Sequence, residues 1–326
     1  MEKPVIRISV RNLVEFILRN GDLESGGTAG DKEAMLKGSR LHRKIQKQMG
    51  SHYQAEVSLK KDTEYEDLIL RVEGRADGIF TQNEKICIDE IKGVYKNLEL
   101  LAEPVLVHRA QALCYAWIYL DDHGLEEIDV QMTYAHLDTE MIKRFRETMT
   151  REELESWYQR LLDSYHKWLS YQMKWREERN RSMEKLEFPF IYRKGQKEMV
   201  AGIYHAISRK EQIFIQAPTG VGKTMSAVFP AVRSIGEGKA ETLFYLTART
   251  ITRTVAQDAF EILRKNGLLF KTVTITAKEK LCFCEKPECN PETCPYAKGH
   301  YDRINDAVYD LLTSGDNFGR EQVEYY

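Results

Sequence analysis

The stretch "QIFIQAPTGVGKT", residues 212–224, constrains the fold more than any other part of the sequence. An apolar run typical of a strand ends in a loop with two glycines, and a helical pattern begins at Lys223. Backbone N–H groups of such a loop wrap a phosphate, while the lysine reaches the outer phosphates and Thr224 holds Mg²⁺. The order predicts an α/β fold with an ATP site made by Thr219, Gly220, Val221, Gly222, Lys223 and Thr224.

The segments around this loop alternate between strand and helix patterns. Helical patterns occupy 195–210 and 250–267, and strand patterns occupy 212–217, 242–248 and 271–277. A strand–helix–strand–helix order predicts a parallel sheet covered by helices.

The first half of the chain has a different order. Ser9 is expected to cap a first helix, a glycine-rich loop follows over 21–31, and Asp31 opens a helix that runs to about Met49. Alternation then predicts strands at 53–60, 67–80, 85–93 and 127–137, with a helix at 104–119 before the last of them. One or two long helices are expected over 140–187, with a core-packing stripe of Leu154, Tyr158, Leu161, Tyr165, Trp168 and Trp175.

Charged residues interrupt two of these predicted strands. "GRADGIF" holds Asp77 in its middle, and "KICIDEIKG" ends with Glu90 and Lys92 on one face, because side chains alternate along a strand. Two carboxylates brought together repel each other and favour a hard divalent cation such as Mg²⁺ or Mn²⁺. A lysine beside them offsets charge on a phosphate, so this set predicts metal-assisted phosphodiester hydrolysis.

Three further residues are candidates for the same site. His42 lies on the apolar face of the helix predicted from Asp31, and imidazole suits Mn²⁺ and related ions. Gln111 and Tyr115 are four residues apart on one helix face, where they can hold a phosphate or the catalytic lysine.

The ordered motifs Gly-x-x-x-His, Gly-Arg-x-Asp-Gly, Asp-Glu-x-Lys-Gly and Gln-x-x-x-Tyr resemble the RecB-like branch of the PD-(D/E)XK nucleases over roughly residues 5–140. The resemblance implies a mixed sheet with flanking helices. It also implies metal binding by His42, Asp77 and Glu90, and catalysis by Asp77, Glu90, Lys92, Gln111 and Tyr115.

The phosphate-loop half resembles superfamily 2 helicases, through Ala-Pro-Thr-Gly-x-Gly-Lys-Thr and through "YLTART" at 245–250. Gln196 matches the glutamine that reads adenine in that family, and 245–250 matches a motif that faces the DNA backbone. A cysteine cluster follows, which resembles the XPD/DinG-like branch over 188–326. That branch implies 5′→3′ DNA unwinding and an iron–sulfur (4Fe–4S) cluster inserted in a partial RecA-like motor domain.

Six cysteines are present, and four of them fall close together, which indicates metal ligation more than disulfides. Cys87 and Cys114 are expected to be buried thiols. The resemblance assigns Cys282, Cys289 and Cys294 as cluster ligands, leaves Cys284 spare and puts the fourth ligand beyond Tyr326. The alternative is a Zn²⁺ site that uses Cys282, Cys284, Cys289 and Cys294.

The domain boundary is predicted at Phe188-Pro189-Phe190, which divides the chain into a nuclease domain (1–187) and a partial motor domain (188–326). No Asp-Glu-Ala-His stretch follows the phosphate loop, so we expect the chain to be the N-terminal portion of a larger nuclease–helicase, able to bind ATP but not to turn it over.

Composition sets the remaining limits. The net charge of −2 gives no global attraction to nucleic acid, so DNA must bind in a local groove. No apolar run approaches the ~20 residues of a membrane span, and the N-terminus lacks a signal-peptide pattern, so we expect a cytoplasmic protein. The family resemblances imply a role in DNA repair or end processing. The alternatives are a module in which the nuclease fold only grips DNA, and a nucleotide-binding regulator.

Overall fold

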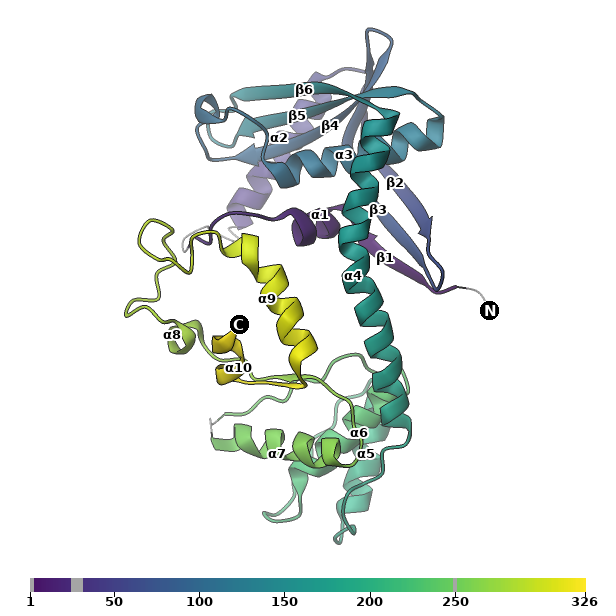
Figure 1. The fold of residues 1–326 in the computed structure, drawn as a ribbon, viewed down its shortest axis with the longest axis vertical. Coiled ribbons are helices and arrows are strands. Elements are labelled where there is room, and N and C mark those ends of the chain that lie inside the picture. Colours follow the sequence, from purple (N-terminus) through teal and green to yellow (C-terminus); the bar gives the residue numbers. More distant parts are fainter. Residues whose placement is uncertain (1–2, 25–31, 249–250) are drawn as a thin grey trace. The chain divides into compact units, whose positions relative to one another are not determined.

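The computed structural model describes residues 3–24, 32–248 and 251–326, which form an α/β protein (Figure 1). The chain divides into two compact units. Unit 1 consists of Met1–Lys167 and Cys282–Ala307, and unit 2 consists of Trp168–Leu281 and Val308–Tyr326. Within the described residues, no helix has the length and apolar character needed to cross a membrane.

Unit 1 is built on a six-stranded mixed sheet in the order β1-β3-β4-β5-β6, with β2 paired to β3. β1 is parallel to β3, β4 is parallel to β5, and the other pairs are antiparallel. The strands are β1 (Val5–Ser9), β2 (Gln54–Glu64), β3 (Ile69–Gln82), β4 (Lys85–Val94), β5 (Glu127–His136) and β6 (Ile142–Thr150).

Helices cover both faces of this sheet. Ser9 caps α1 by accepting a hydrogen bond from the Asn12 backbone N–H, as predicted. α2 packs its Leu41 and Ile45 on Ile91 of β4. The predicted loop at 21–31 and the helix start at Asp31 lie partly outside the described residues. The helices of this region are α1 (Val10–Leu18), α2 (Lys32–Gln48), the 3-10 helix η1 (Leu98–Leu100) and α3 (Leu106–His123).

The prediction of helix from 140 onward is wrong at its start. Residues Ile142–Thr150 form β6, and the helix α4 (Arg151–Glu184) begins only afterwards. Partly buried and exposed residues alternate from Phe145 to Thr150, so the segment suits the open edge of β5. The core-packing prediction for the long helix is confirmed at Leu154, Tyr158, Leu161 and Trp168, which are all buried.

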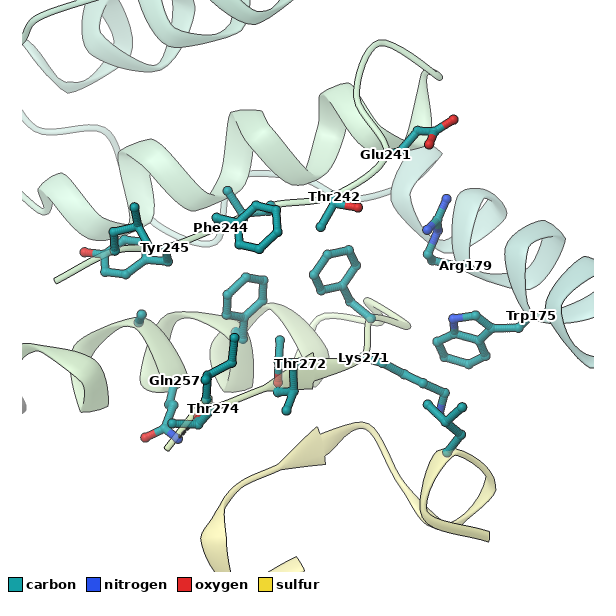
Figure 2. A pocket seen from close by; sticks show the side chains of 18 of the residues that line it. Trp175, Arg179, Glu241, Thr242, Phe244, Tyr245, Gln257, Lys271, Thr272 and Thr274 are labelled. Atoms are coloured by element: carbon teal, nitrogen blue, oxygen red, sulfur yellow. Dashed lines mark hydrogen bonds between the residues drawn. The ribbon is translucent and has the colours of Figure 1, made fainter. Parts of the chain in front are cut away.

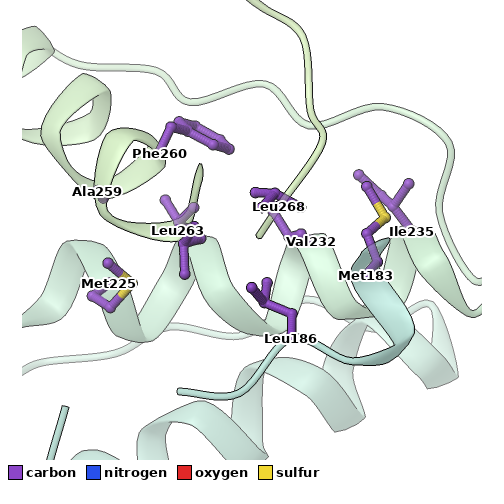
Figure 3. Close-up of a cluster of buried hydrophobic side chains, with 10 residues drawn as sticks. Met183, Leu186, Met225, Val232, Ile235, Ala259, Phe260, Leu263 and Leu268 are labelled. Atoms are coloured by element: carbon purple, nitrogen blue, oxygen red, sulfur yellow. The ribbon is translucent and has the colours of Figure 1, made fainter. Parts of the chain in front are cut away.

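Unit 2 is mainly helical. Its apolar core joins the end of α4 to α6 and α7, with Val232 and Leu263 completely buried (Figure 3). A two-stranded parallel sheet pairs Thr272–Val273 with Asn317–Phe318. The elements after α4 are α5 (Gln196–Arg209), α6 (Lys223–Gly236), α7 (Ile251–Lys265), β7 (Thr272–Val273), α8 (Lys278–Leu281), α9 (His300–Ser314), β8 (Asn317–Phe318) and α10 (Arg320–Tyr325).

The strands predicted at 212–217 and 242–248 are absent from the described structure, and the one predicted at 271–277 is reduced to two residues. Phe214 and Leu246 are 94% and 87% exposed, so these apolar segments are not covered by a neighbouring strand or helix in the described structure. The predicted parallel sheet therefore reduces to the β7–β8 pair among the described residues. The compact units also differ from the predicted segments, because the division falls within α4 and residues 282–307 join unit 1.

Candidate functional site

Lys92 is the centre of a polar cluster in unit 1. Its Nζ donates to Glu90 Oε1 and to Gln111 Oε1, both at 2.7 Å. Glu90 and Lys92 share one face of β4 by strand alternation, and Gln111 comes from α3. The structure therefore brings three of the predicted site residues into direct contact.

Asp77 lies where the hydrogen-bond ladder of the sheet is interrupted. β1 pairs with β3 as far as Glu73, and β4 pairs with β3 only from Gly78. In the gap between them, Asp77 Oδ2 accepts a hydrogen bond from the Ile91 backbone N–H at 2.7 Å. His42 of α2 places Nδ1 3.7 Å from Asp77 Oδ1, so both predicted residues reach the same place.

Tyr115 of α3 fills the rest of this gap. Its hydroxyl bonds to the backbone of Arg75. A Cβ added at Gly74 would lie 2.6 Å from that hydroxyl, which is closer than real contacts allow. The first glycine of the Gly-Arg-x-Asp-Gly motif is thus required by the close approach of a tyrosine.

Glu90 is a buried acid of the cluster whose pKa is shifted. It is 4% exposed, and among the described residues its Oε2 has no hydrogen-bond partner. Burial, together with the nearby charge of Asp77, raises the pKa of Glu90 to about 7 against the opposing charge of Lys92. The cluster thus holds a carboxyl oxygen with a free lone pair beside a second carboxylate and an imidazole.

This donor set suits a hard divalent cation by its chemistry. The present arrangement is different, since Glu90 Oε1 bonds to Lys92 and Asp77 Oδ2 bonds to backbone. Across the parts of the chain that the structure describes, no three His, Cys, Asp or Glu side chains are grouped as metal ligands.

Two residues that the sequence analysis did not select support this cluster. Gln46 of α2 donates to the Asp77 carbonyl at 3.0 Å and so fixes the strand that carries Asp77. Asp89 is fully buried on the opposite face of β4 and accepts from Thr133, Gln131 and Tyr53. The sequence does show Gln131 and Thr133, the two polar partners of Asp89, in the predicted strand 127–137. It does not show that this strand pairs with β4, so the partners could not be assigned.

The phosphate loop of unit 2 has two glycines with positive φ and a helix that starts at its predicted end, but not the strand predicted before it. Gly220 and Gly222 have φ of +81° and +75°, and α6 begins at Lys223. Lys223 Nζ donates to the carbonyls of Ala217 and Pro218 at 3.0 and 2.8 Å. The lysine is therefore held by carbonyl groups of its own loop.

Gln196 packs directly on this loop. It is 4% exposed, and a Cβ at Gly222 would lie 2.6 Å from its Nε2. Its Oε1 accepts from the Arg193 backbone N–H at 3.0 Å, and the Arg193 guanidinium donates to the Gly220 carbonyl. A cavity of about 480 Å³ adjoins the loop and is lined by Arg193, Thr219, Gly220, Gly222, Lys223 and Thr224 among others.

A second cavity of about 690 Å³ lies between the extended residues 242–247 and 271–275 (Figure 2). Phe244 and Tyr245 line one side of it and Thr272 and Thr274 the other, and Lys271 lies 4.2 Å from the Trp175 ring centroid. Tyr245 also donates to Thr224 Oγ1 at 3.4 Å. Residues 249–250 of the predicted "YLTART" motif lie outside the described residues.

The cysteine segment brings three thiols together. Cys284 Sγ is 3.8 Å from Cys294 Sγ, and the neighbouring thiols of Cys294 and Cys282, with some burial, raise the pKa of Cys284 to about 11. Cys284, expected to be spare, contacts the other two. Cys289 was predicted as a ligand together with Cys282 and Cys294, and that role stays a prediction.

A family model described as DEAD/DEAH box helicase matches residues 193–286. This segment contains Gln196 and the whole phosphate loop, and the match supports a superfamily 2 helicase domain. The match supports nucleotide-dependent helicase activity for this segment, with ATP and Mg²⁺ as the implied cofactors.

Among curated proteins, no sequence matches this chain. A solved structure titled "Crystal structure of SSO0001" is similar at 19% identity, with a TM-score of 0.33, over 48% of this chain and 75% of that chain.

Proposed function

We propose that unit 1 is a metal-dependent DNA nuclease and that it is joined to an ATP-dependent DNA helicase segment of the XPD/DinG type, for 5′→3′ unwinding in repair or end processing. The observation that carries the nuclease proposal is Lys92, which bridges Glu90 and Gln111 beside the unpartnered Oε2 of Glu90.

His42, Asp77 and Glu90 would hold the divalent cation. A bound Mg²⁺ or Mn²⁺ supplies an activated water and offsets negative charge on the scissile phosphate. Gln111 orients the Lys92 ammonium toward the face of β4 that carries Glu90, where it stabilises developing charge on phosphate oxygens. Tyr115 closes the gap in the sheet behind Asp77.

The buried environment of Glu90 supports this role. Burial leaves the Glu90 carboxyl group about half protonated at neutral pH, because its pKa lies near 7 while no cation is bound. Binding of a cation at Oε2 would satisfy the oxygen that now lacks a partner and would favour the ionised form.

The helicase segment adds nucleotide binding through the 219–224 loop, with Gln196 beside it. For the cysteine segment we propose a metal site, an iron–sulfur cluster or Zn²⁺, in which Cys282, Cys284, Cys289 and Cys294 take part. The mutual approach of three of these thiols supports that proposal.

Cleavage of labelled single-stranded DNA by the purified chain, with Mn²⁺ or Mg²⁺ and without ATP, tests the nuclease. We expect Lys92→Ala and Glu90→Gln each to lower the rate by about 10²–10⁴-fold. Lys85→Ala is the matched control, because Lys85 lies on the same strand and pairs with Glu127 on the surface. Undiminished cleavage by both site variants would overturn the proposal, and metal-independent DNA binding without cutting would favour a gripping module.

A further inference from the structure

The cysteine segment is folded onto the N-terminal part of unit 1, far from it in sequence. The Leu23 backbone N–H donates to the Ala297 carbonyl at 2.8 Å. The Tyr301 backbone N–H donates to the Gly21 carbonyl at 2.9 Å. These two bonds join the turn after α1 to the turn before α9.

Side chains reinforce this junction from both partners. Asp302 Oδ1 accepts from the Gly21 N–H at 2.8 Å, and Asp22 Oδ1 accepts from the Gly299 N–H at 2.6 Å. Arg19 stacks over the Tyr301 ring at 3.7 Å. We call residues 16–23 and 294–305 together the clasp.

Cys294 forms the base of one half of the clasp. Its N–H donates to the Asn290 carbonyl at 2.7 Å, and its own carbonyl accepts from Ala297 and Lys298, each at 3.2 Å. Cys294 is 7% exposed and its thiol touches Cys284. Through its backbone, Cys294 therefore belongs to the same short turn whose Ala297 carbonyl accepts from Leu23, and its thiol contacts Cys284.

The other half of the clasp leads toward the candidate nuclease site. Residues 16–18 are the end of α1, and Asn305 Nδ2 donates to the Phe16 carbonyl at 2.5 Å. α1 packs against α3, which carries Gln111. A contiguous set of packed elements thus connects the cysteine turn to the residue that orients Lys92.

We propose that contact between the Cys284 and Cys294 thiols stabilises the clasp, and that the clasp in turn holds the end of α1. Cys284 and Cys294 therefore act as positioning residues for α1. When the thiol contact is broken, the turn at 294–300 loses its shape and the grip on residues 21–23 weakens. The part of the proposal that concerns Lys92 rests on the proposed nuclease function, and the clasp itself does not.

The test is amide hydrogen exchange of Gly21 and Leu23, measured on the whole chain without DNA or added metal. The double variant Asp22→Ala/Asp302→Ala removes two hydrogen bonds to charged acceptors. We expect exchange at both amides to accelerate at least about tenfold, together with faster alkylation of Cys294 by N-ethylmaleimide. Cys284→Ala should accelerate exchange at Leu23 in the same direction.

Two controls keep the test specific. Asp306→Ala alters an exposed acid on the same helix and should leave exchange at Gly21 and Leu23 at the wild-type rate. Asp22→Asn/Asp302→Asn keeps an acceptor oxygen and should restore most of the protection. Unchanged exchange in the double alanine variant would overturn the clasp, and unchanged exchange in Cys284→Ala would overturn its link to the thiols. Neither readout depends on DNA cleavage, so a failed nuclease proposal gives a different pattern.

Discussion

β4 in unit 1 and residues 242–246 in unit 2 were both predicted to be strands, and they reach opposite outcomes. Both carry apolar residues at strand spacing, yet Ile88 of β4 is fully buried and Leu246 is 87% exposed. β4 has β3 on one edge and β5 on the other, whereas residues 242–246 make no backbone hydrogen bond within the described structure. A strand-like sequence pattern gives only a conformational preference. A strand forms where a neighbouring strand offers its backbone groups for pairing.

The two functional lysines show the same difference. Lys92 is held between side chains of two elements, Glu90 and Gln111, and is ready to act on a ligand. Lys223 donates only to carbonyls of its own loop, at Ala217 and Pro218, and must leave them to reach a phosphate. The site in unit 1 is preorganised by its sheet, and the loop in unit 2 depends on its ligand.

Matched truncations in the two units should have the largest effect. Ile88→Ala should lower the free energy of unfolding of unit 1 by about 2–5 kcal/mol, because it opens a cavity in a closed core. Leu246→Ala should change stability by less than about 0.5 kcal/mol, because the side chain is exposed. Urea titrations followed by segment-resolved hydrogen exchange measure both changes, and equal effects would abolish the contrast.

The second prediction concerns the effect of low pH on the stability of unit 1. Burial, with a smaller effect of the Lys92 charge, lowers the pKa of His108 to about 4, and its Nδ1 lies 3.2 Å from the Tyr134 hydroxyl. The unfolded chain binds this proton near pH 6.5 and the folded chain only near pH 4, so stability present above pH 6.5 is lost as the pH falls toward 4. The contribution of His108 to this loss should reach about 3 kcal/mol. Glu90 opposes it, because its raised pKa gives stability that increases as the pH falls from 7 toward 4.5.

Hydrogen exchange of unit 1 at pH 7, 5.5 and 4.5, compared between wild type and His108→Gln, isolates this contribution. The variant should gain stability relative to wild type as the pH falls, and His205→Gln, an exposed histidine of unit 2, should follow the wild-type profile. Parallel profiles for wild type and His108→Gln would contradict the prediction.

Nucleotide binding gives the smallest of the three expected effects. Lys223→Ala should weaken ATP binding by about 1.5–3 kcal/mol, the range for hydrogen bonds to charged groups. Titration of a fluorescent ATP analogue with Mg²⁺ measures it, with Lys239→Ala as a control, because Lys239 pairs with Glu237 on the surface. Equal affinity of the Lys223 variant and the wild type would show that nucleotide does not bind in the 219–224 loop.

The sequence was sufficient for local features of unit 1. Strand alternation put Glu90 and Lys92 on one face of β4, and the helical spacing of Gln111 and Tyr115 put both against the sheet, as the structure has them. It was insufficient where a partner decides the outcome. β1 was missed because its alternation covers only four residues before the capping position of α1, and β6 was taken for helix because its alternation became meaningful only beside β5.

Long-range backbone contacts were also beyond the sequence. The backbone hydrogen bonds of Gly21 to Tyr301 and of Leu23 to Ala297 use peptide groups, which every residue carries. No side-chain pattern in the sequence could therefore predict them. The gap in the ladder beside Asp77 was hidden for the same reason, since it depends on where two neighbouring strands stop.

Because unit 1 includes Cys282–Ala307, its last piece leaves the ribosome long after its first. At about 5–20 residues per second, the wait between Lys167 and Ala307 is on the order of ten seconds. During that interval the peptide groups of Gly21 and Leu23 lack their partners. The sheet of unit 1 must therefore remain folded without Cys282–Ala307, the segment that holds the end of α1. Trp168–Leu281 of unit 2 is synthesised before unit 1 can be completed.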